Sequence, residues 1–343
     1  MIRGREFHSI LNSIFDGDIR GIGESEQLQT NCPRCQQRDG LTFGDDKYNL
    51  EINTEKRVFR CWKCDSPKFS GSLGRLIKIF GTTSDYELYE SYAGSMVDYS
   101  ENEDEKDFGF VEMPSEFIAF SEMDADNPIH LEAYNYMVLE RQIELSVLTK
   151  FGIGFCVDGK HWGRIIIPSY DQHGDLNYFV GRAYKGQKPT YMNPKADKDI
   201  IIFNEGLINW DSTIYIVEGA FEFLSFPVNI VPQLGKTLSG AFFFKLKQKK
   251  PEIVIVLDPD AYRESIEIYQ KLAIVYGEDA HKIKIVKLKG TYDLDEIRMK
   301  FGKNAVIQKL RTARELITED YFVGNKYYNE EYYKRTYSGN TGR

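Results

Sequence analysis

The sequence is poor in cysteine, histidine and proline, and it contains no long apolar run. Its 343 residues include five cysteines, five histidines and 11 prolines. No apolar stretch approaches the ~20 residues needed to cross a bilayer, and the start of the chain, Met1 to Glu6, lacks the apolar core of a secretion signal. These absences argue against a disulfide-rich secreted protein and a helical membrane protein. We therefore expect a soluble protein of the cytoplasm.

Positive charge is also in the minority. Lysine and arginine number 44 against 52 aspartate and glutamate residues, a net charge of −8. This balance excludes a protein that is basic over its whole surface, but it is compatible with a local basic groove for nucleic acid. The length suits two or three domains, and a hydrophobic content of 42% supplies their cores.

The sequence has no P-loop. Leu234 to Ser239 contains a Gly-Lys-Thr triplet, but Ile230 stands where the first glycine of that loop is required. We therefore expect no fused ATP-driven helicase.

Four of the five cysteines form two CxxC pairs separated by 25 residues. They are Cys32, Cys35, Cys61 and Cys64. Four thiolates complete a closed tetrahedral site, which is typical of structural Zn²⁺; a rubredoxin-type iron site is the alternative. Short strands are expected at 41–43, 48–52 and 57–60, which predicts a zinc ribbon. Cys156 stands alone and is predicted to be a small core residue.

Basic and aromatic side chains alternate around the second cysteine pair. They are Arg57, Phe59, Arg60, Trp62 and Lys63. This mixture suits single-stranded nucleic acid, through phosphate contacts and base stacking. The alternative is that Phe59 and Trp62 only pack the small ribbon.

Acidic residues follow three apolar runs in the second half of the chain. The runs are 214–217, 253–257 and 282–288, and they have the pattern of buried parallel strands. Because the carboxyl ends of parallel strands meet at one edge of a sheet, we expect the acids that follow to converge there. They are Glu218, Glu222, Asp258, Asp260, Asp293 and Asp295. Carboxylates favour Mg²⁺ or Mn²⁺, which can assist phosphoryl transfer. The alternative is that these acids only cap helices.

The remaining segments complete the predicted domains. Residues 1–80 are the zinc ribbon and 81–116 an acidic flexible linker, since 98–107 holds six acids and one lysine. Residues 117–210 are a basic subdomain whose strands carry Arg164 and Arg182, and such a face could hold template and nucleotide phosphates. Residues 211–310 hold the parallel sheet. Residues 311–343 form a helix and a tyrosine-rich tail.

This combination of motifs resembles the bacterial and phage DNA primases, most of all those of bacteriophage replication. Glu218-Gly219, Asp258-Pro259-Asp260 and the acids at 293 and 295 resemble the Toprim domain that primases share with topoisomerases and some nucleases. In primases the equivalent of Arg182 lies in a GGR strand that is followed by PKYLN. Here Thr190 replaces that lysine, and Lys188 lies two residues away.

The resemblance implies an α+β multidomain fold: a zinc ribbon, a mixed α/β basic subdomain and a Rossmann-like parallel-sheet domain. It implies the synthesis of short RNA primers on single-stranded DNA by nucleotidyl transfer, with structural Zn²⁺ and catalytic Mg²⁺ or Mn²⁺. The expected catalytic residues are Glu218, Asp258 and Asp260. The expected nucleotide and template contacts are Arg164, Arg182, Lys188 and Lys236.

The resemblance also implies partners and a location. The partners are single-stranded DNA, ribonucleoside triphosphates and a separate replicative helicase, with no membrane. The location is the host cytoplasm if the chain is phage-encoded. The alternatives are a zinc-ribbon recombination mediator and a nuclease-like or topoisomerase-like protein, none of which would make primers.

Overall fold

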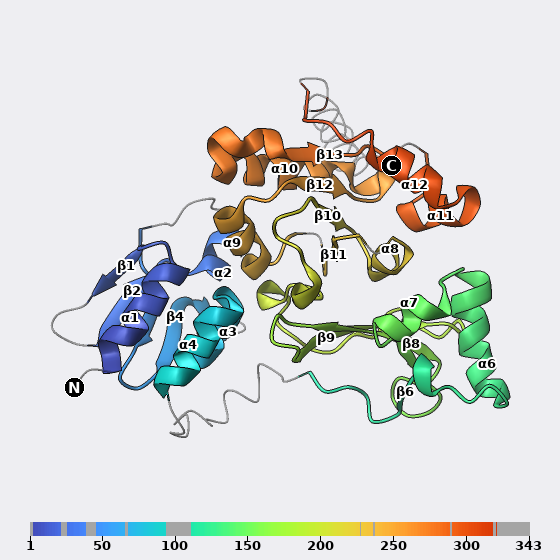
Figure 1. Cartoon of the computed structure of the whole chain (residues 1–343), viewed down its shortest axis with the longest axis horizontal. Helices are drawn as coiled ribbons and strands as arrows, with labels where there is room; N and C mark the ends of the chain where they lie inside the picture. Colours follow the sequence, from blue (N-terminus) through green and yellow to red (C-terminus); the bar gives the residue numbers. More distant parts are fainter. Residues whose placement is uncertain are drawn as a thin grey trace, which may run out of the picture.

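The computed structural model describes residues 3–21, 26–38, 46–65, 68–93, 111–226, 228–235, 237–288, 290–317 and 320. These residues form three sheets, which follow one another along the chain from blue to red in Figure 1. Within the described residues, no helix combines the length and the apolar character needed to cross a membrane.

The first sheet is an antiparallel ribbon with the order β1-β2-β3-β4-β5. Its strands are β1 (Ile19–Gly21), β2 (Gln27–Thr30), β3 (Leu50–Asn53), β4 (Val58–Asp65) and β5 (Lys68–Ser72). Around it lie α1 (Arg3–Ile14), α2 (Pro33–Arg38), α3 (Leu73–Phe80) and α4 (Thr83–Ala93). Alternation in β3 buries Leu50 and Ile52 on the face that meets the helices. Two of the three predicted ribbon strands overlap β3 and β4, and the third, at 41–43, lies outside the described residues.

Helix α4 lies where the linker was expected to begin. Its Tyr89 is buried, and the ring centroid lies 5.5 Å from that of Phe7 in α1. Helix α4 therefore packs with the ribbon domain up to Ala93, because Tyr89 and Ala93 are buried there and Tyr86 and Tyr92 pack against the same core. The acidic run 98–107 lies outside the described residues.

The second sheet is antiparallel, with the order β6-β7-β8-β9. It contains β6 (Phe117–Ala119), β7 (Gly154–Cys156), β8 (Arg164–Tyr170) and β9 (Leu176–Ala183), with helices α6 (Pro128–Tyr134) and α7 (Leu145–Lys150) and the π-helical segment η2 (Asn135–Glu140) between β6 and β7. A Cβ atom at Gly154 would lie 2.3 Å from the carbonyl oxygen of Ile118. Glycine is therefore required where β7 pairs with β6.

The third sheet is wholly parallel, with the order β11-β10-β12-β13, as the apolar runs predicted. Its strands are β10 (Ile214–Val217), β11 (Ile230–Pro232), β12 (Ile253–Val256) and β13 (Ile283–Ile285). Its helices are α8 (Ala220–Ser225), α9 (Gly240–Lys249), α10 (Tyr262–Tyr276), α11 (Leu294–Phe301) and α12 (Lys303–Leu310). The predicted fold class is confirmed.

The parallel sheet separates two hydrophobic cores. In β12, Ile253 and Ile255 belong to a core that they share with the ribbon domain, whereas Val254 and Val256 belong to a core shared with the second sheet. Because both faces are covered, the strand is apolar throughout instead of alternating with polar residues.

The ribbon domain packs against the parallel-sheet domain through α2 and α9, as Figure 1 shows. Arg34, inside the first CxxC pair, forms a buried ion pair with Asp197 at 3.2 Å and a partly exposed one with Asp199 at 3.6 Å. A Cβ atom at Gly240 would lie 3.1 Å from the Cα of Arg34. Gly240 therefore permits the close approach of the two helices, which fixes the ribbon relative to the sheet.

Candidate active site

Carboxylates converge at the carboxyl edge of the parallel sheet. Glu218 follows β10, while Asp258 and Asp260 follow its neighbour β12. One ligand oxygen from each of the three lies within 4.8 Å of the others. The neighbouring parallel strands end together at this edge, which is why residues 40 positions apart meet there.

A second carboxylate group shares Asp258 with the first. It contains Glu222 from α8 and Asp293 at the start of α11, again with all three ligand atoms within 4.8 Å of one another. Glu222 is buried and the other two are half-buried. Asp258 is thus positioned to bridge two cations, and a set of hard oxygen donors suits a divalent metal.

Burial and mutual repulsion perturb these acids in the protein without metal. Burial, reinforced by Glu218 and Asp293, raises the pKa of Asp258 to about 7. Burial, reinforced by Asp258, raises the pKa of Glu222 to about 8. The pKa of Glu218 is also raised, first by burial and then by Asp260. Bound cations would reverse these shifts by favouring the charged form.

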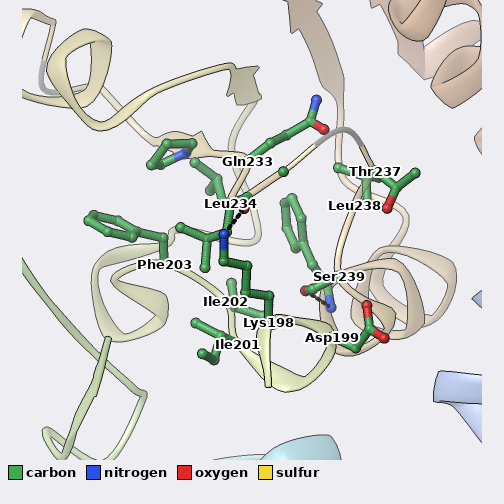
Figure 2. A pocket seen from close by; sticks show the side chains of 14 residues that line it. Lys198, Asp199, Ile201, Ile202, Phe203, Gln233, Leu234, Thr237, Leu238 and Ser239 are labelled. Atoms are coloured by element: carbon green, nitrogen blue, oxygen red, sulfur yellow. Dashed lines mark hydrogen bonds between the residues drawn. The ribbon is translucent and has the colours of Figure 1, made fainter. Parts of the chain in front are cut away.

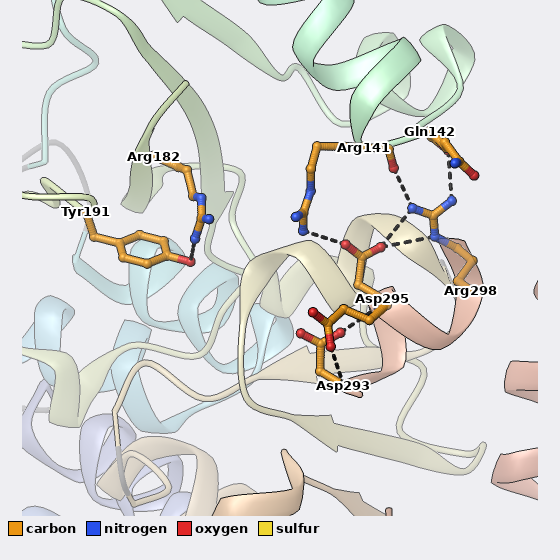
Figure 3. Close-up of polar contacts among 8 residues, drawn as sticks. Arg141, Gln142, Arg182, Tyr191, Asp293, Asp295 and Arg298 are labelled. Carbon is orange, nitrogen blue, oxygen red and sulfur yellow. Dashed lines mark hydrogen bonds and ion pairs between the residues drawn. The ribbon is translucent and has the colours of Figure 1, made fainter. Parts of the chain in front are cut away.

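Asp293 and Asp295 have different partners in the structure. Asp293 caps α11 by accepting a hydrogen bond of 2.7 Å from the backbone N–H of Glu296, and it still reaches the second carboxylate group. Asp295 is 1% exposed and forms ion pairs with Arg298, at 2.8 Å, and with Arg141 (Figure 3). It belongs to neither carboxylate group among the described residues. Its oxygens are engaged by the guanidinium groups of Arg141 and Arg298, and the metal-ligand role expected for it stays a prediction.

Arg141, which the sequence analysis did not single out, lies beside this site. Its guanidinium lies 4.4 Å from the ring centroid of Phe221, and Arg182 approaches the same ring at 5.5 Å. Phe221 lies in α8, the helix that also carries Glu222, so both cations approach the element that contributes one of the carboxylates. Figure 3 shows Arg141 directed toward Asp295 and Arg182 toward Tyr191. Because Arg141 is 154 residues from Asp295 in sequence, no local motif marks it.

The other basic residues predicted to contact nucleotide or template differ from one another in burial. Arg164 is 2% exposed and donates hydrogen bonds to the carbonyl oxygens of Pro189, at 2.7 Å, and Thr190, at 3.1 Å. It therefore holds the loop after β9 in place. Lys188 is exposed on that loop, and Lys236 lies outside the described residues.

The four cysteines of the ribbon come together as predicted. Their sulfur atoms lie 3.2 Å (Cys35–Cys64), 3.5 Å (Cys35–Cys61) and 4.0 Å (Cys32–Cys64) apart, and all four side chains are buried. Thiolates around one zinc ion, at Zn–S distances of about 2.3 Å, lie roughly 3.8 Å from one another. The four sulfur donors therefore fit a structural zinc ion. The prediction that the two CxxC pairs form one four-cysteine site is confirmed.

The aromatic and basic residues near the second cysteine pair divide into two sets. Phe59 is buried and its ring packs on Phe69 at 4.8 Å, so it belongs to the ribbon core. Arg57 points inward, toward the Phe7 ring and the carbonyl of Ala93. Trp62, however, is 53% exposed, with the Arg60 guanidinium 4.2 Å above its ring. Arg60 and Trp62 thus lie together on the exposed surface of the ribbon.

Comparison with known proteins gives a consistent picture. No family model matches the sequence. The DNA primase of Clostridium acetobutylicum is 23% identical in an alignment 338 positions long, which covers 82% of this chain and 54% of the relative. The DNA primase of Thermotoga maritima is 24% identical in an alignment 315 positions long, which covers 78% of this chain and 54% of the relative. The chain thus spans about half the length of these curated relatives.

Among solved structures, the zinc-binding and RNA polymerase domains of the Aquifex aeolicus primase align with a TM-score of 0.48 at 20% identity, covering 92% of this chain and 86% of that one. The sequence relatives carry the conclusion: over more than three quarters of its length this chain is similar to bacterial DNA primases, as its motifs predicted.

Proposed function

We propose that this protein is a DNA primase, which joins ribonucleoside triphosphates into short RNA primers on a single-stranded DNA template. The observation that carries the proposal is the convergence of Glu218, Asp258 and Asp260 at the ends of adjacent parallel strands. The same chain holds a four-cysteine site in a separate ribbon, and its sequence relatives are DNA primases. The alternative role, helix capping, accounts for Asp293 but not for Glu218 and Asp260.

The carboxylates would hold one or two Mg²⁺ or Mn²⁺ ions, with Asp258 shared between them. When bound, such ions activate the primer 3′-hydroxyl and neutralise charge on the transferring phosphoryl group. Glu218 remains open to a second role as general base, because its raised pKa brings it closer to the working pH. Glu222 is buried, and it would act as a metal ligand in the second carboxylate group only when its side chain is ionised.

Cationic side chains next to the carboxylates would bind phosphate groups of the template or nucleotide. Arg141 and Arg182 flank Phe221, and the Nε atoms of both are buried without a hydrogen-bond partner among the described residues. Planar guanidinium groups suit phosphate recognition. Lys188 is a further candidate, because it is exposed on the neighbouring loop.

The zinc ribbon would recognise the template. Its exposed Arg60 and Trp62 offer a phosphate contact and a stacking platform for a base. We also propose that a separate helicase supplies the unwound strand, and that the enzyme works in the cytoplasm, where bacterial and phage DNA is replicated.

The deciding experiment is primer synthesis on a single-stranded DNA template with labelled ribonucleotides and Mg²⁺ or Mn²⁺. Short labelled products that require both template and metal would support the proposal. Binding to the template without product would favour the recombination mediator. Shortened or relaxed DNA would favour a nuclease or a topoisomerase.

A further inference from the structure

Two cavities adjoin at the carboxyl end of β11. The first, of about 390 Å³, is lined by Glu218 and Asp260 of the carboxylate site and by Glu264. The second, of about 210 Å³, lies between the segments 198–203 and 231–239 and is lined mainly by apolar side chains (Figure 2). Gln233 and Gly235 line both cavities. The polar site and the apolar cavity therefore meet at these two residues.

Gln233 is an unusual residue at this junction. It is 9% exposed, and neither its side-chain oxygen nor its nitrogen has a hydrogen-bond partner in the described part of the chain. Its backbone N–H donates to the carbonyl of Val217 at 2.8 Å, which fixes it beside the residue that precedes Glu218. A buried polar group left unpaired costs about 1–3 kcal/mol. A bound molecule with both donors and acceptors would remove that cost.

The walls of the apolar cavity are held without help from Gln233. The Lys198 ammonium donates to the carbonyl of Leu234 at 2.8 Å, and Ser239 caps α9 by accepting from the backbone N–H of Phe242 at 3.1 Å (Figure 2). Phe203 and Phe242 supply flat apolar surface. The cavity thus offers a largely apolar lining whose supporting hydrogen bonds do not involve Gln233.

The two cavities together match a molecule with a charged end and a flat heterocyclic end. The carboxylates repel phosphate unless a cation lies between them, so the charged end must be one that binds metal. We propose that the apolar cavity is a subsite for the base of a nucleoside triphosphate whose phosphates lie at the carboxylate–metal site. Gln233 hydrogen-bonds the nucleoside where the cavities meet. This inference rests on the proposed function and adds to it a place for the base.

The test compares two probes that differ in whether they carry a nucleoside. Binding of each of the four ribonucleoside triphosphates, and of inorganic tripolyphosphate, is measured at equilibrium with Mn²⁺. Gln233→Leu removes the amide, and Gly235→Val fills the junction. A Cβ atom at Gly235 meets nothing within 4 Å, so the fold accommodates it. We expect both variants to bind at least one nucleoside triphosphate about tenfold more weakly and tripolyphosphate unchanged. Gln270→Leu, on the exposed side of α10, is the matched control.

The possible results separate this inference from the function on which it rests. If the wild-type protein binds neither probe, the metal site and the proposed function both fail. If it binds nucleoside triphosphates no better than tripolyphosphate, the base subsite is wrong while the metal site stands. If the variants lose affinity equally for nucleoside triphosphates and for tripolyphosphate, the base subsite is wrong, and Gln233 instead helps to position the carboxylates.

Discussion

At the scale of single residues, the site is governed by electrostatic repulsion between neighbouring carboxylates. Asp258 belongs to both carboxylate groups and is therefore the residue whose charge matters most. Replacing it with asparagine keeps the shape and removes one negative charge.

Asp258→Asn should lower primer synthesis by roughly a hundredfold or more, because a metal-bound phosphoryl transition state is sensitive to the loss of a ligand charge. Without metal the variant should be no less stable than the wild type, since one source of repulsion is gone. A Mg²⁺ titration of primer synthesis checks this, with Asp211→Asn on the exposed loop before β10 as control. Normal priming by Asp258→Asn at the wild-type Mg²⁺ concentration would reduce the carboxylates to capping residues.

The same acids predict how the stability of the metal-free protein depends on pH. The pKa values of Asp258, about 7, and Glu222, about 8, lie above those of unfolded carboxyl groups. The folded state then binds more protons than the unfolded state, so the free energy of unfolding should fall as pH rises from about 4 to 8. Urea unfolding at pH 5 and pH 8 measures this fall. Saturating Mg²⁺ should reduce it, and a metal-independent slope would contradict the assignment.

Residue patterns predicted part of the site and could not predict the rest. Glu218, Asp258 and Asp260 directly follow apolar strands, so their convergence follows from the parallel order of those strands. Arg141 and Gln233 have no such signal, because their roles depend on elements brought together by folding. Asp295 has a carboxylate in the expected place, but the ion pair with Arg298 one helical turn later engages it.

At the scale of elements, the proposed function assigns template recognition to the zinc ribbon, which is built around the two CxxC pairs, and chemistry to the parallel sheet. Cys61→Ser should release zinc, because it removes one of four thiolate ligands. Initiation on a bare template should be lost, while extension of a supplied primer should partly survive. Zinc content and the two reactions can be measured on the same preparation. Equal loss of both reactions in a protein whose core stays folded would end this division of roles.

Strands β8 and β9 carry two arginines with different expected roles. Arg182→Ala should weaken template or nucleotide binding and flatten the salt dependence of template binding, because a phosphate contact is lost. Arg164→Ala is the comparison: the buried hydrogen bonds to Pro189 and Thr190 disappear, so thermal stability should fall. Binding isotherms at several salt concentrations, together with melting curves, separate the two effects. An unchanged isotherm for Arg182→Ala would make it a structural residue as well.

Elements with strong apolar patterns were predicted, and weakly patterned ones were missed. The run Ile253–Val256 could only be a strand buried on both faces, and it is β12. Helix α4 was expected to be linker because its sequence is mostly polar, and only contacts from α1 and α3 show where its Tyr89 and Ala93 are buried. Long-range packing of this kind has no signature in the local sequence.

At the scale of the whole molecule, the ribbon and the carboxylate site are parts of one packed structure. Arg34 joins the zinc knuckle to Asp197 and Asp199, and the parallel sheet contributes to both hydrophobic cores. The proposed recognition surface and the proposed reaction site are thus held at a defined separation.

The sequence contains no P-loop, and we propose that a separate helicase supplies the unwound template. We therefore expect primer synthesis on duplex DNA with a fork to rise when the cognate hexameric helicase and ATP are added. The same comparison on a fully single-stranded template measures how much of the helicase stimulation of primer synthesis is independent of unwinding. No stimulation on either template, together with no co-purification, would count against the partnership.

The sharing of Asp258 between two carboxylate groups has a consequence for how the enzyme responds to magnesium. A first Mg²⁺ ion bound by Asp258 would displace the proton that its raised pKa retains, and the ionised carboxylate would also serve the second carboxylate group. We therefore expect the two ions to bind cooperatively, so that activity would follow the free Mg²⁺ concentration with a Hill coefficient above one. Small changes in cellular free Mg²⁺ would consequently alter the rate of priming more than in proportion.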